Sequence, residues 1–323
     1  MVEKKSAGDI CFDILNYTFF ILFTLICVFP FYYLFINTVS DNGLIAKGLI
    51  NFYPRTQYGT NESGEAVYHF GMQFKNYLAL VTAGATKEKP INDLVMSFFV
   101  TIARTVIGTV VSTLASGFVG YLVTKQEMWH RKLCYRFMII TMYFSAGLIP
   151  WFTTMQMLGL TNNFLAYIIP GIVSVYNIIM VKTYIESIPA ELEESAAIDG
   201  ASYFTIFVKI IWPLSKPILA TIAIWCAVGH WNSFQDSLIL MSGKTELQTL
   251  QHRLYIYLNS TSNLGAQMAT STSGLTESQR QQMLSTKPRQ YTVAMVTAIP
   301  ILCVYPFMQK YFVKGLMLGA VKG

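Results

Sequence analysis

Residues 187–213 read SIPAELEESAAIDGASYFTIFVKIIWP, and this charged, glycine-containing stretch decides how the apolar sequence around it is interpreted. Ser187 can cap a helix, and Pro189 suits the first helical turn. Acidic side chains in a first turn complement the positive end of the helix dipole. Three glutamates occupy that position: Glu191, Glu193 and Glu194. The sequence therefore predicts a short helix on the membrane surface.

Gly200 permits a sharp bend after this helix, because glycine readily adopts backbone angles that other residues avoid. Residues 203–211 then form a second amphipathic piece, which ends before Pro213. A helix, a bend and a helix together make a rigid projection. Such a projection can enter a groove on a partner protein.

The sequence on both sides of this projection is strongly apolar. The whole chain of 323 residues is 53% apolar and only 12% charged, which is about half the charge of an ordinary soluble protein. A bilayer core requires about 20 apolar residues per helix. We predict an all-α membrane protein, a single membrane domain over residues 1–323, with six spans at about 14–37, 94–123, 135–158, 164–186, 214–240 and 290–312.

Lysine and arginine set the predicted orientation, because they are enriched in short cytoplasmic segments. With both termini on one side, that side collects twelve of the 23 basic residues. We therefore expect both termini, and residues 187–213, to be cytoplasmic. The long loops 40–93 and 242–289 are then extracellular. Residues 258–275 approach low complexity, and residues 276–284 could form a short surface helix capped by Thr276.

The second span carries small residues at every fourth position, which lets other helices approach closely. These residues are Gly108, Ser112, Ser116 and Gly120. Arg104 is the single ionisable residue of this span, and we expect its long side chain to reach the headgroups. The spans have no Asp, Glu or Lys near their centres, which disfavours a carrier driven by protons or sodium.

Polar residues near the outer end of the fifth span are candidates for a solute pathway. On a continuous helix, His230, Ser233 and Ser237 would share one face beside Trp231. Bonds between helices are an equally good interpretation of these side chains. The candidate pathway residues are Tyr143, Ser145, His230, Trp231, Asn232, Ser233, Gln235 and Asp236.

The order Glu194, Ser195, Ala196, three residues, Gly200, nine residues, Ile210, one residue, Trp212, Pro213 resembles the EAA motif of membrane subunits of bacterial ABC importers. Ser195 replaces the usual first alanine, and Trp212 replaces the usual leucine. The segments 198–201 and 213–217 look like the carbohydrate-uptake branch, to which the second permease of the maltose importer belongs. The segments 144–150, 227–233 and 304–323 are similar to a subgroup typified by the LplC and YtcP permeases.

This resemblance implies an importer that assembles from several chains. The expected partners are a second homologous permease, two cytosolic ATPase subunits, an extracellular sugar-binding protein and the lipid of a bacterial plasma membrane. ATP and Mg²⁺ would bind the ATPase subunits, and we expect no cofactor in this chain. The resemblance implies that these residues couple the chain to the ATPases: Glu193, Glu194, Ser195, Ala196, Asp199, Gly200, Ala201 and Pro213.

Other motifs carry little weight. Residues 243–245 read GKT, but a phosphate-binding loop needs glycine where this chain has Leu238, so we expect no ATP hydrolysis by this chain. His69, His130 and His252 lack metal-ligand spacing and are interpreted as surface residues. We expect no metal site. The basic residues form no patch that would indicate nucleic-acid binding.

Three functional hypotheses follow from these observations. The first is a permease subunit that forms half of the pathway for a sugar or an oligosaccharide, or for a non-sugar solute. The second is a membrane enzyme acting on lipid-linked sugars, and the third is an ion-coupled carrier. Five basic residues in each outer loop suit an acidic sugar and equally a docking surface for the binding protein.

Overall fold

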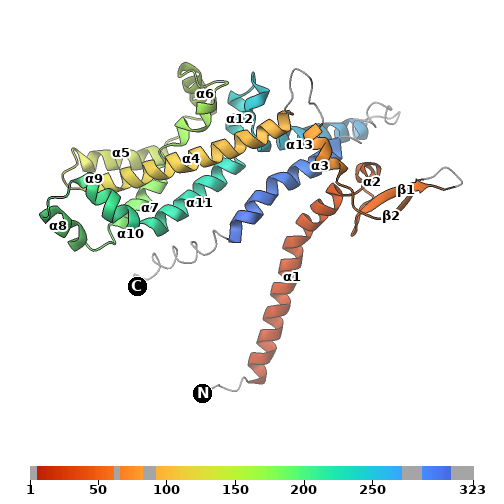
Figure 1. The fold of residues 1–323 in the computed structure, drawn as a ribbon, viewed down its shortest axis with the longest axis horizontal. Coiled ribbons are helices and arrows are strands. Elements are labelled where there is room, and N and C mark those ends of the chain that lie inside the picture. Colours follow the sequence, from red (N-terminus) through yellow and green to blue (C-terminus); the bar gives the residue numbers. More distant parts are fainter. Residues whose placement is uncertain (1–5, 62–65, 83–91, 271–285, 307–323) are drawn as a thin grey trace. The chain divides into compact units, whose positions relative to one another are not determined.

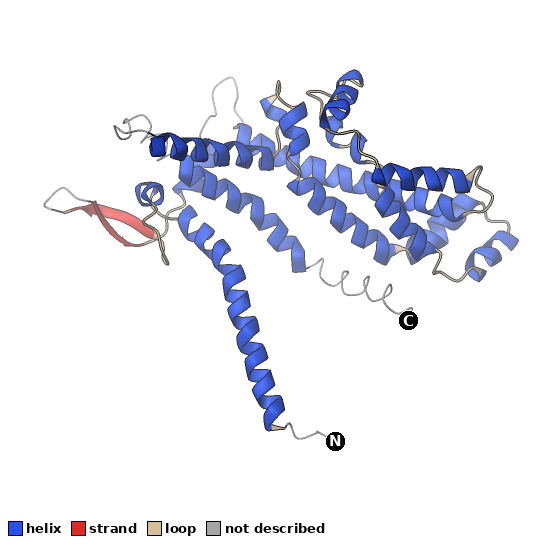
Figure 2. Ribbon diagram, turned by 180° about the vertical axis from the view of Figure 1, so that it is seen from behind, coloured by secondary structure: helices blue, strands red, loops and turns tan. Residues whose placement is uncertain are grey.

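The computed structural model describes residues 6–61, 66–82, 92–270 and 286–306. The chain divides into two units, of which the first contains Met1–Asn92 and Leu254–Ile299, and the second contains Asp93–Arg253 and Pro300–Gly323. Figure 2 shows that helices dominate both, with one two-stranded hairpin. Each unit is described separately.

The first unit begins with the long helix α1 (Ala7–Thr38). Its first turn is closed by Asp9, whose carboxylate accepts a 2.9 Å hydrogen bond from the backbone N–H of Ser6. Apolar side chains from Ile10 to Tyr32 are largely exposed along it, as expected of a helix that contacts lipid. A short helix, α2 (Asn42–Lys47), follows and ends at Gly48, whose φ is +69°.

A small β-sheet in the predicted loop 40–93 corrects the all-α expectation. Strands β1 (Arg55–Thr60) and β2 (Ala66–Phe70) pair antiparallel, and α3 (Lys75–Thr82) follows them. Both segments contain β-branched and aromatic residues, which suit strands: Thr56, Tyr58 and Thr60 in β1, and Val67, Tyr68 and Phe70 in β2. The strands have only six and five residues, so their signal in the sequence is weak beside that of the long apolar helices.

Two further helices belong partly to this unit. The helix α13 (Leu250–Thr270) extends into residues 258–275, whose composition approaches low complexity, so part of the predicted loop 242–289 is helical. The expected surface helix at 276–284 lies outside the described residues. Residues 286–306 are helical and cover most of the predicted sixth span.

The second unit is built around α4 (Asp93–Thr124), which packs against α7 (Val175–Ile185) and α11 (Lys216–Asn232), as Figure 1 shows. The small-residue stripe lies in these interfaces, as predicted. A β-carbon added at Gly120 would stand 2.8 Å from Val181 Cγ1, and the Ser112 hydroxyl donates to the Gly171 carbonyl at 2.8 Å. The small size of these residues therefore allows the helices to pack closely.

Breaks interrupt three of the predicted spans. The region 135–158 is not one helix: α5 (Arg131–Tyr143) and α6 (Leu148–Met157) are separated at Gly147, whose φ is +86°. The predicted turn at 159–163 is present, with Asn162 at φ +55°. The fourth region consists of η1 (Phe164–Tyr167), η2 (Ile169–Gly171) and α7, with a bend of 45°.

The fifth region also breaks, because α11 ends at Asn232 and α12 (Gln235–Leu240) starts a new helix. Before it lie α8 (Glu191–Ile198), α9 (Tyr203–Ile206), the π-helical η3 (Phe207–Ile211) and α10 (Trp212–Leu214), and after it lies η4 (Thr245–Leu247). Among the described residues, two helices are long and apolar enough to span a membrane, or four if each bent pair is one span. The number six remains a prediction.

Candidate functional site

The projection predicted at 187–213 is present as α8, a bend and a second helical piece. This piece continues through η3 and α10 to Leu214, so the expectation that it ends before Pro213 is wrong. Gly200 lies at φ +78°, and its N–H donates to the Ala197 carbonyl at 3.0 Å. The next N–H, that of Ala201, donates to the Ala196 carbonyl at 3.0 Å. These bonds close the end of α8 and reverse the chain. We call residues 187–213 the coupling segment.

The predicted helix cap is wrong. The Ser187 hydroxyl donates to the Tyr184 carbonyl at 2.6 Å, so this serine closes the end of α7. Ala190 precedes the first turn of α8 and provides no side-chain cap. The three glutamates do lie in that first turn, as predicted. Their charge therefore compensates the helix dipole without a capping hydroxyl.

The inner face of the coupling segment is fixed to α4. Lys125 forms an ion pair with Glu193, and its ammonium also lies 4.4 Å from the centre of the Tyr121 ring. The Tyr121 hydroxyl donates to the backbone carbonyl of Tyr203 at 3.3 Å. Both halves of the bent segment thus contact the last turns of one long helix.

Apolar packing strengthens this attachment. Ile206, Phe207 and Ile211 are buried in one core with residues of α4, α7 and α11. Trp212, which departs from the usual leucine, packs on Phe207 with ring centres 5.6 Å apart. It also occupies the space beside Gly117, where a β-carbon would stand 2.7 Å from the indole. The substitution is therefore accommodated by a glycine on α4.

The outer face carries exposed polar and apolar side chains together. Ile198 is 86% exposed and Phe204 is 67% exposed. Glu194, Ser195 and Asp199 are exposed beside them. Among the other predicted coupling residues, Ala196 and Ala201 face the core, Gly200 makes the bend, and Pro213 follows at the start of α10. The structure thus brings the predicted set together on one projecting element.

A second feature is a cavity of about 450 Å³ within the second unit. It is formed by α4, the start of α7 and the end of α11. Its lining combines polar side chains, two aromatic rings and exposed backbone: Arg104, Ser112, Gly171, Ser174, Tyr176, Asn177, Trp225, Cys226, Gly229, His230 and Ser233. We call it the polar cavity.

Local structure orients the groups of this cavity. Ser174 caps α7 by accepting from the N–H of Asn177, and the Asn177 amide donates to Cys226 Sγ at 3.4 Å. The rings of Tyr176 and Trp225 have centres 5.8 Å apart and tilt by 32°. An aromatic wall beside amide, hydroxyl and imidazole groups can bind a ligand that has both apolar faces and hydroxyl groups.

Arg104 corrects an expectation, because it does not reach outward to headgroups. Its side chain is 3% exposed and forms a two-point ion pair with Asp236, with one contact at 3.1 Å. It also donates to the Ser233 carbonyl at 3.1 Å and lies 4.6 Å from the centre of the Tyr167 ring. The pair ties α4 to the break between α11 and α12.

The structure separates the predicted pathway residues. His230 and Ser233 line the polar cavity, but the break after Asn232 removes the continuous face that was expected to include Ser237. Asp236 forms an ion pair with Arg104, and the Asn232 side-chain oxygen accepts a hydrogen bond from the Gln251 amide at 3.2 Å.

The remaining candidates lie elsewhere. Trp231 is 7% exposed and lines a different, apolar cavity of about 190 Å³. Gln235 begins α12. Tyr143 is 86% exposed at the end of α5, and Ser145 lines another cavity, of about 510 Å³. Sequence reasoning missed Asn177, Tyr176 and Trp225, although polar and aromatic residues facing one another across two spans could have indicated them.

His252 is also misassigned as a surface residue. It is 3% exposed, and its Nδ1 lies 3.0 Å from the Ser237 hydroxyl. Burial lowers the pKa of His252 below the usual 6.5, and the charge of Arg253 lowers it further, while Asp236 acts in the opposite direction. The neutral imidazole is therefore part of the folded structure next to α12.

Spanning helices, a bent projecting segment fixed to one of them and a polar cavity between them define an integral membrane permease. This class agrees with the comparisons with known proteins. Residues 2–317 match the family "Binding-protein-dependent transport system inner membrane component", and the chain belongs to this family. It is thus a permease of an ABC transport system. Membership of this family favours the permease hypothesis over an ion-coupled carrier and over an enzyme acting on lipid-linked sugars.

Similar proteins cover nearly the whole chain. The polygalacturonan/rhamnogalacturonan transport system permease YtcP of Bacillus subtilis is 32% identical, over 97% of this chain and 98% of the relative. LplC of the same organism is 30% identical over 100% and 98%. A solved bacterial ABC transporter involved in the import of the acidic polysaccharide alginate matches with a TM-score of 0.76 and 26% identity, over 96% of this chain and 100% of that chain.

Proposed function

We propose that this chain is one of two membrane subunits of an ATP-driven importer that carries an oligosaccharide into the cell. The observation that carries this proposal is the two-sided construction of the coupling segment. One face is fixed to α4 through Lys125, Glu193 and Tyr121, and the other exposes Ile198 and Phe204 beside acidic residues. An apolar surface with a charged rim suits the groove of a partner protein.

ATP and Mg²⁺ would bind two partner ATPase subunits, and this chain would supply the mechanical link. Closure of the ATPase pair would displace the docked coupling segment. Because α9 and η3 share a core with α4, α7 and α11, these helices would move with it. Two arrangements of the same packed helices are sufficient for alternating access.

An oligosaccharide is supported by two observations. Two similar proteins, YtcP and the alginate importer, belong to transport systems for polysaccharides. The polar cavity of this chain offers aromatic rings for the apolar faces of sugar rings and hydrogen-bonding groups for their hydroxyls. A second permease would complete the pathway, and an extracellular sugar-binding protein would deliver the solute. The assembly would reside in a bacterial plasma membrane with both termini of this chain cytoplasmic.

Copurification from the native membrane tests the composition. A tagged chain should retain a second permease and two ATPase copies for each permease pair. In proteoliposomes, a sugar-loaded binding protein should stimulate ATP hydrolysis and uptake together. A chain that transports without any partner would refute the proposal.

Two substitutions test the coupling segment. Glu194→Lys reverses a charge on the exposed face, and Gly200→Pro is incompatible with a φ of +78°. Both should lower uptake at least tenfold while the chain still inserts in the membrane. Glu127→Lys, an equal charge change at an exposed position outside the segment, is the matched control and should retain uptake. Equal uptake by all three variants would contradict the proposed docking.

A further inference from the structure

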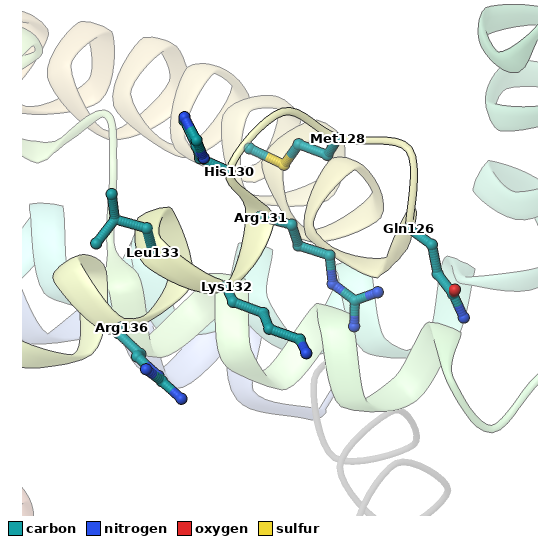
Figure 3. Close-up of a pocket in the computed structure, with 7 residues that line it drawn as sticks. All are labelled: Gln126, Met128, His130, Arg131, Lys132, Leu133 and Arg136. Atoms are coloured by element: carbon teal, nitrogen blue, oxygen red, sulfur yellow. The ribbon is translucent and has the colours of Figure 1, made fainter.

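A basic cavity lies where the chain turns from α4 into α5. It has a volume of about 730 Å³ and is lined by Gln126, Met128, His130, Arg131, Lys132, Leu133 and Arg136. Figure 3 shows the charged ends of Arg131, Lys132 and Arg136 extending to the same side of α5, while His130 points the other way. The lining has three permanent cations and no acidic residue.

Within the described part of the chain, none of the three cations lies within ion-pair distance of a carboxylate, whereas Lys125 and Lys182 nearby are both paired with glutamates. An unneutralised cluster attracts an anion, and an arginine fork beside a second cation suits a phosphate group. The chemistry of the cavity therefore selects a phosphate-bearing ligand.

The length of α4 places this cavity at the membrane boundary. The helix has 32 residues, and at about 1.5 Å per residue it is about 48 Å long. The hydrocarbon core is only about 30 Å thick, so the end of α4 and the turn after it reach the headgroup layer. Trp129, in this turn, is 81% exposed, which is typical of tryptophan at the membrane interface.

The surface of α5 next to the cavity is apolar. Leu133, Phe137 and Ile140 are each more than 60% exposed, and their spacing of four and three residues puts them on one face. Lys132 and Arg136 share the neighbouring face. Cations at headgroup level beside an exposed apolar strip match both parts of a phospholipid: a phosphate and its acyl chains.

We propose that the cavity formed by residues 126–136 binds the headgroup of an anionic phospholipid, with its phosphate between Arg131, Lys132 and Arg136 and its acyl chains along Leu133 and Phe137. The site is separate from the polar cavity and from the coupling segment. It requires a membrane surface at the end of α4, and does not require the proposed transport function.

Native mass spectrometry of the purified assembly tests the site by titration with phosphatidylglycerol, phosphatidylcholine and inorganic phosphate. The assembly should retain phosphatidylglycerol in preference to phosphatidylcholine. The double variant Lys132→Gln/Arg136→Gln should bind it about 30-fold more weakly, since each basic side chain near an anionic lipid contributes about a factor of five. Lys209→Gln/Lys216→Gln removes the same charge at exposed positions outside the cavity and should retain the lipid.

Three results would overturn the proposal. Equal retention of the two lipids would show that charge does not select the ligand. Equal weakening by both double variants would indicate general attraction to the membrane. Displacement of the lipid by millimolar inorganic phosphate would identify a site for the free anion. Thermal unfolding of each variant checks that the fold is retained, and none of these readouts depends on sugar transport.

Discussion

Two ion pairs hold α4, one in its first half at Arg104 and one directly after its end at Lys125, and the pairs differ in burial and geometry. Arg104 and Asp236 are 3% and 19% exposed and form a two-point contact that is extended by the Tyr167 ring. Lys125 and Glu193 are 16% and 23% exposed and meet at a single point. Removing one member of the Arg104–Asp236 pair leaves a buried charge without its partner. Water can solvate either member of the Lys125–Glu193 pair more easily.

This difference fits the elements that the pairs connect. Arg104 holds the break between α11 and α12, where the polar cavity ends. Lys125 holds the coupling segment, which is proposed to move with a partner ATPase. The Arg104 pair is more buried than the Lys125 pair. We therefore expect the end of α4 to move with the coupling segment while the helix keeps its packing around Arg104.

Removal of one partner from the buried pair should have the largest effect. Asp236→Ala leaves Arg104 charged and buried, which costs about 3–5 kcal/mol of folding stability. The thermal unfolding midpoint of the purified assembly measures this loss. Asp93→Ala is the matched control, because Asp93 pairs with Arg253 at 3.2 Å but is 40% exposed. Equal destabilisation by the two substitutions would show that the buried Arg104–Asp236 pair contributes no more to stability than a more exposed ion pair.

A methyl group added at either of two glycines of α4 tests how closely this helix packs against its neighbours. In Gly120→Ala the new β-carbon would lie 2.8 Å from Val181 and 3.3 Å from the Ile178 carbonyl, and backbone must shift. We expect a loss of about 1–3 kcal/mol.

Gly108→Ala is the comparison in the middle of α4, beside His230. Its β-carbon would lie 2.5 Å from the tip of the His230 ring, which can rotate away. This variant should unfold at a higher temperature than Gly120→Ala, although the displaced ring should reduce uptake through the polar cavity. A larger stability loss for Gly108→Ala would contradict this ranking.

Charge reversal at the partly buried pair Lys125–Glu193 should change coupling more than stability. Lys125→Glu and Glu193→Lys each place like charges together, at a cost of about 1 kcal/mol. Each should lower the number of sugars carried per ATP in proteoliposomes. The double variant restores opposite charges and should recover this ratio. A double variant as poor as the single ones would show that the pair has no part in coupling.

The smallest expected effect concerns pH. Since burial depresses the pKa of His252 in the folded chain, the unfolded chain binds the proton more tightly. The contribution of this residue to stability is therefore fully present above pH 6.5 and is lost as pH falls below it. Unfolding midpoints at pH 7.5 and 5.5 measure the loss, which should be smaller in His252→Gln. An unchanged pH dependence in that variant would exclude this imidazole as its source.

The coupling segment could be predicted almost completely from the sequence, because its signals are local. Glu194 and Gly200 occupy a spacing that is itself the motif, and a left-handed glycine needs no distant partner to form. The helix cap was one exception, because the Ser187 hydroxyl could bond to α7 or to α8, and it closes the end of α7. Only the packed structure decides between two such neighbours.

The polar cavity could not be predicted in the same way, because it depends on residues distant in sequence. Arg104 and Asp236 are 132 positions apart, and each taken alone resembles a residue near a membrane surface. The break after Asn232, which Arg104 contacts through the Ser233 carbonyl, places His230 and Ser237 on different helices. Hydropathy likewise marks apolar tracts but not the break at Gly147, where φ is +86°, or the break at Ser233, whose carbonyl accepts from Arg104.

Hydrogen–deuterium exchange of the coupling segment tests the central claim most directly. Peptides covering residues 191–204 would be compared in the permease pair alone and in the complete assembly with its ATPase subunits, with α5 as the internal reference. The account predicts strong protection of 191–204 by the ATPases and unchanged exchange in α5. Equal exchange of 191–204 with and without the ATPases would show that this segment docks on neither of them, and would contradict the account.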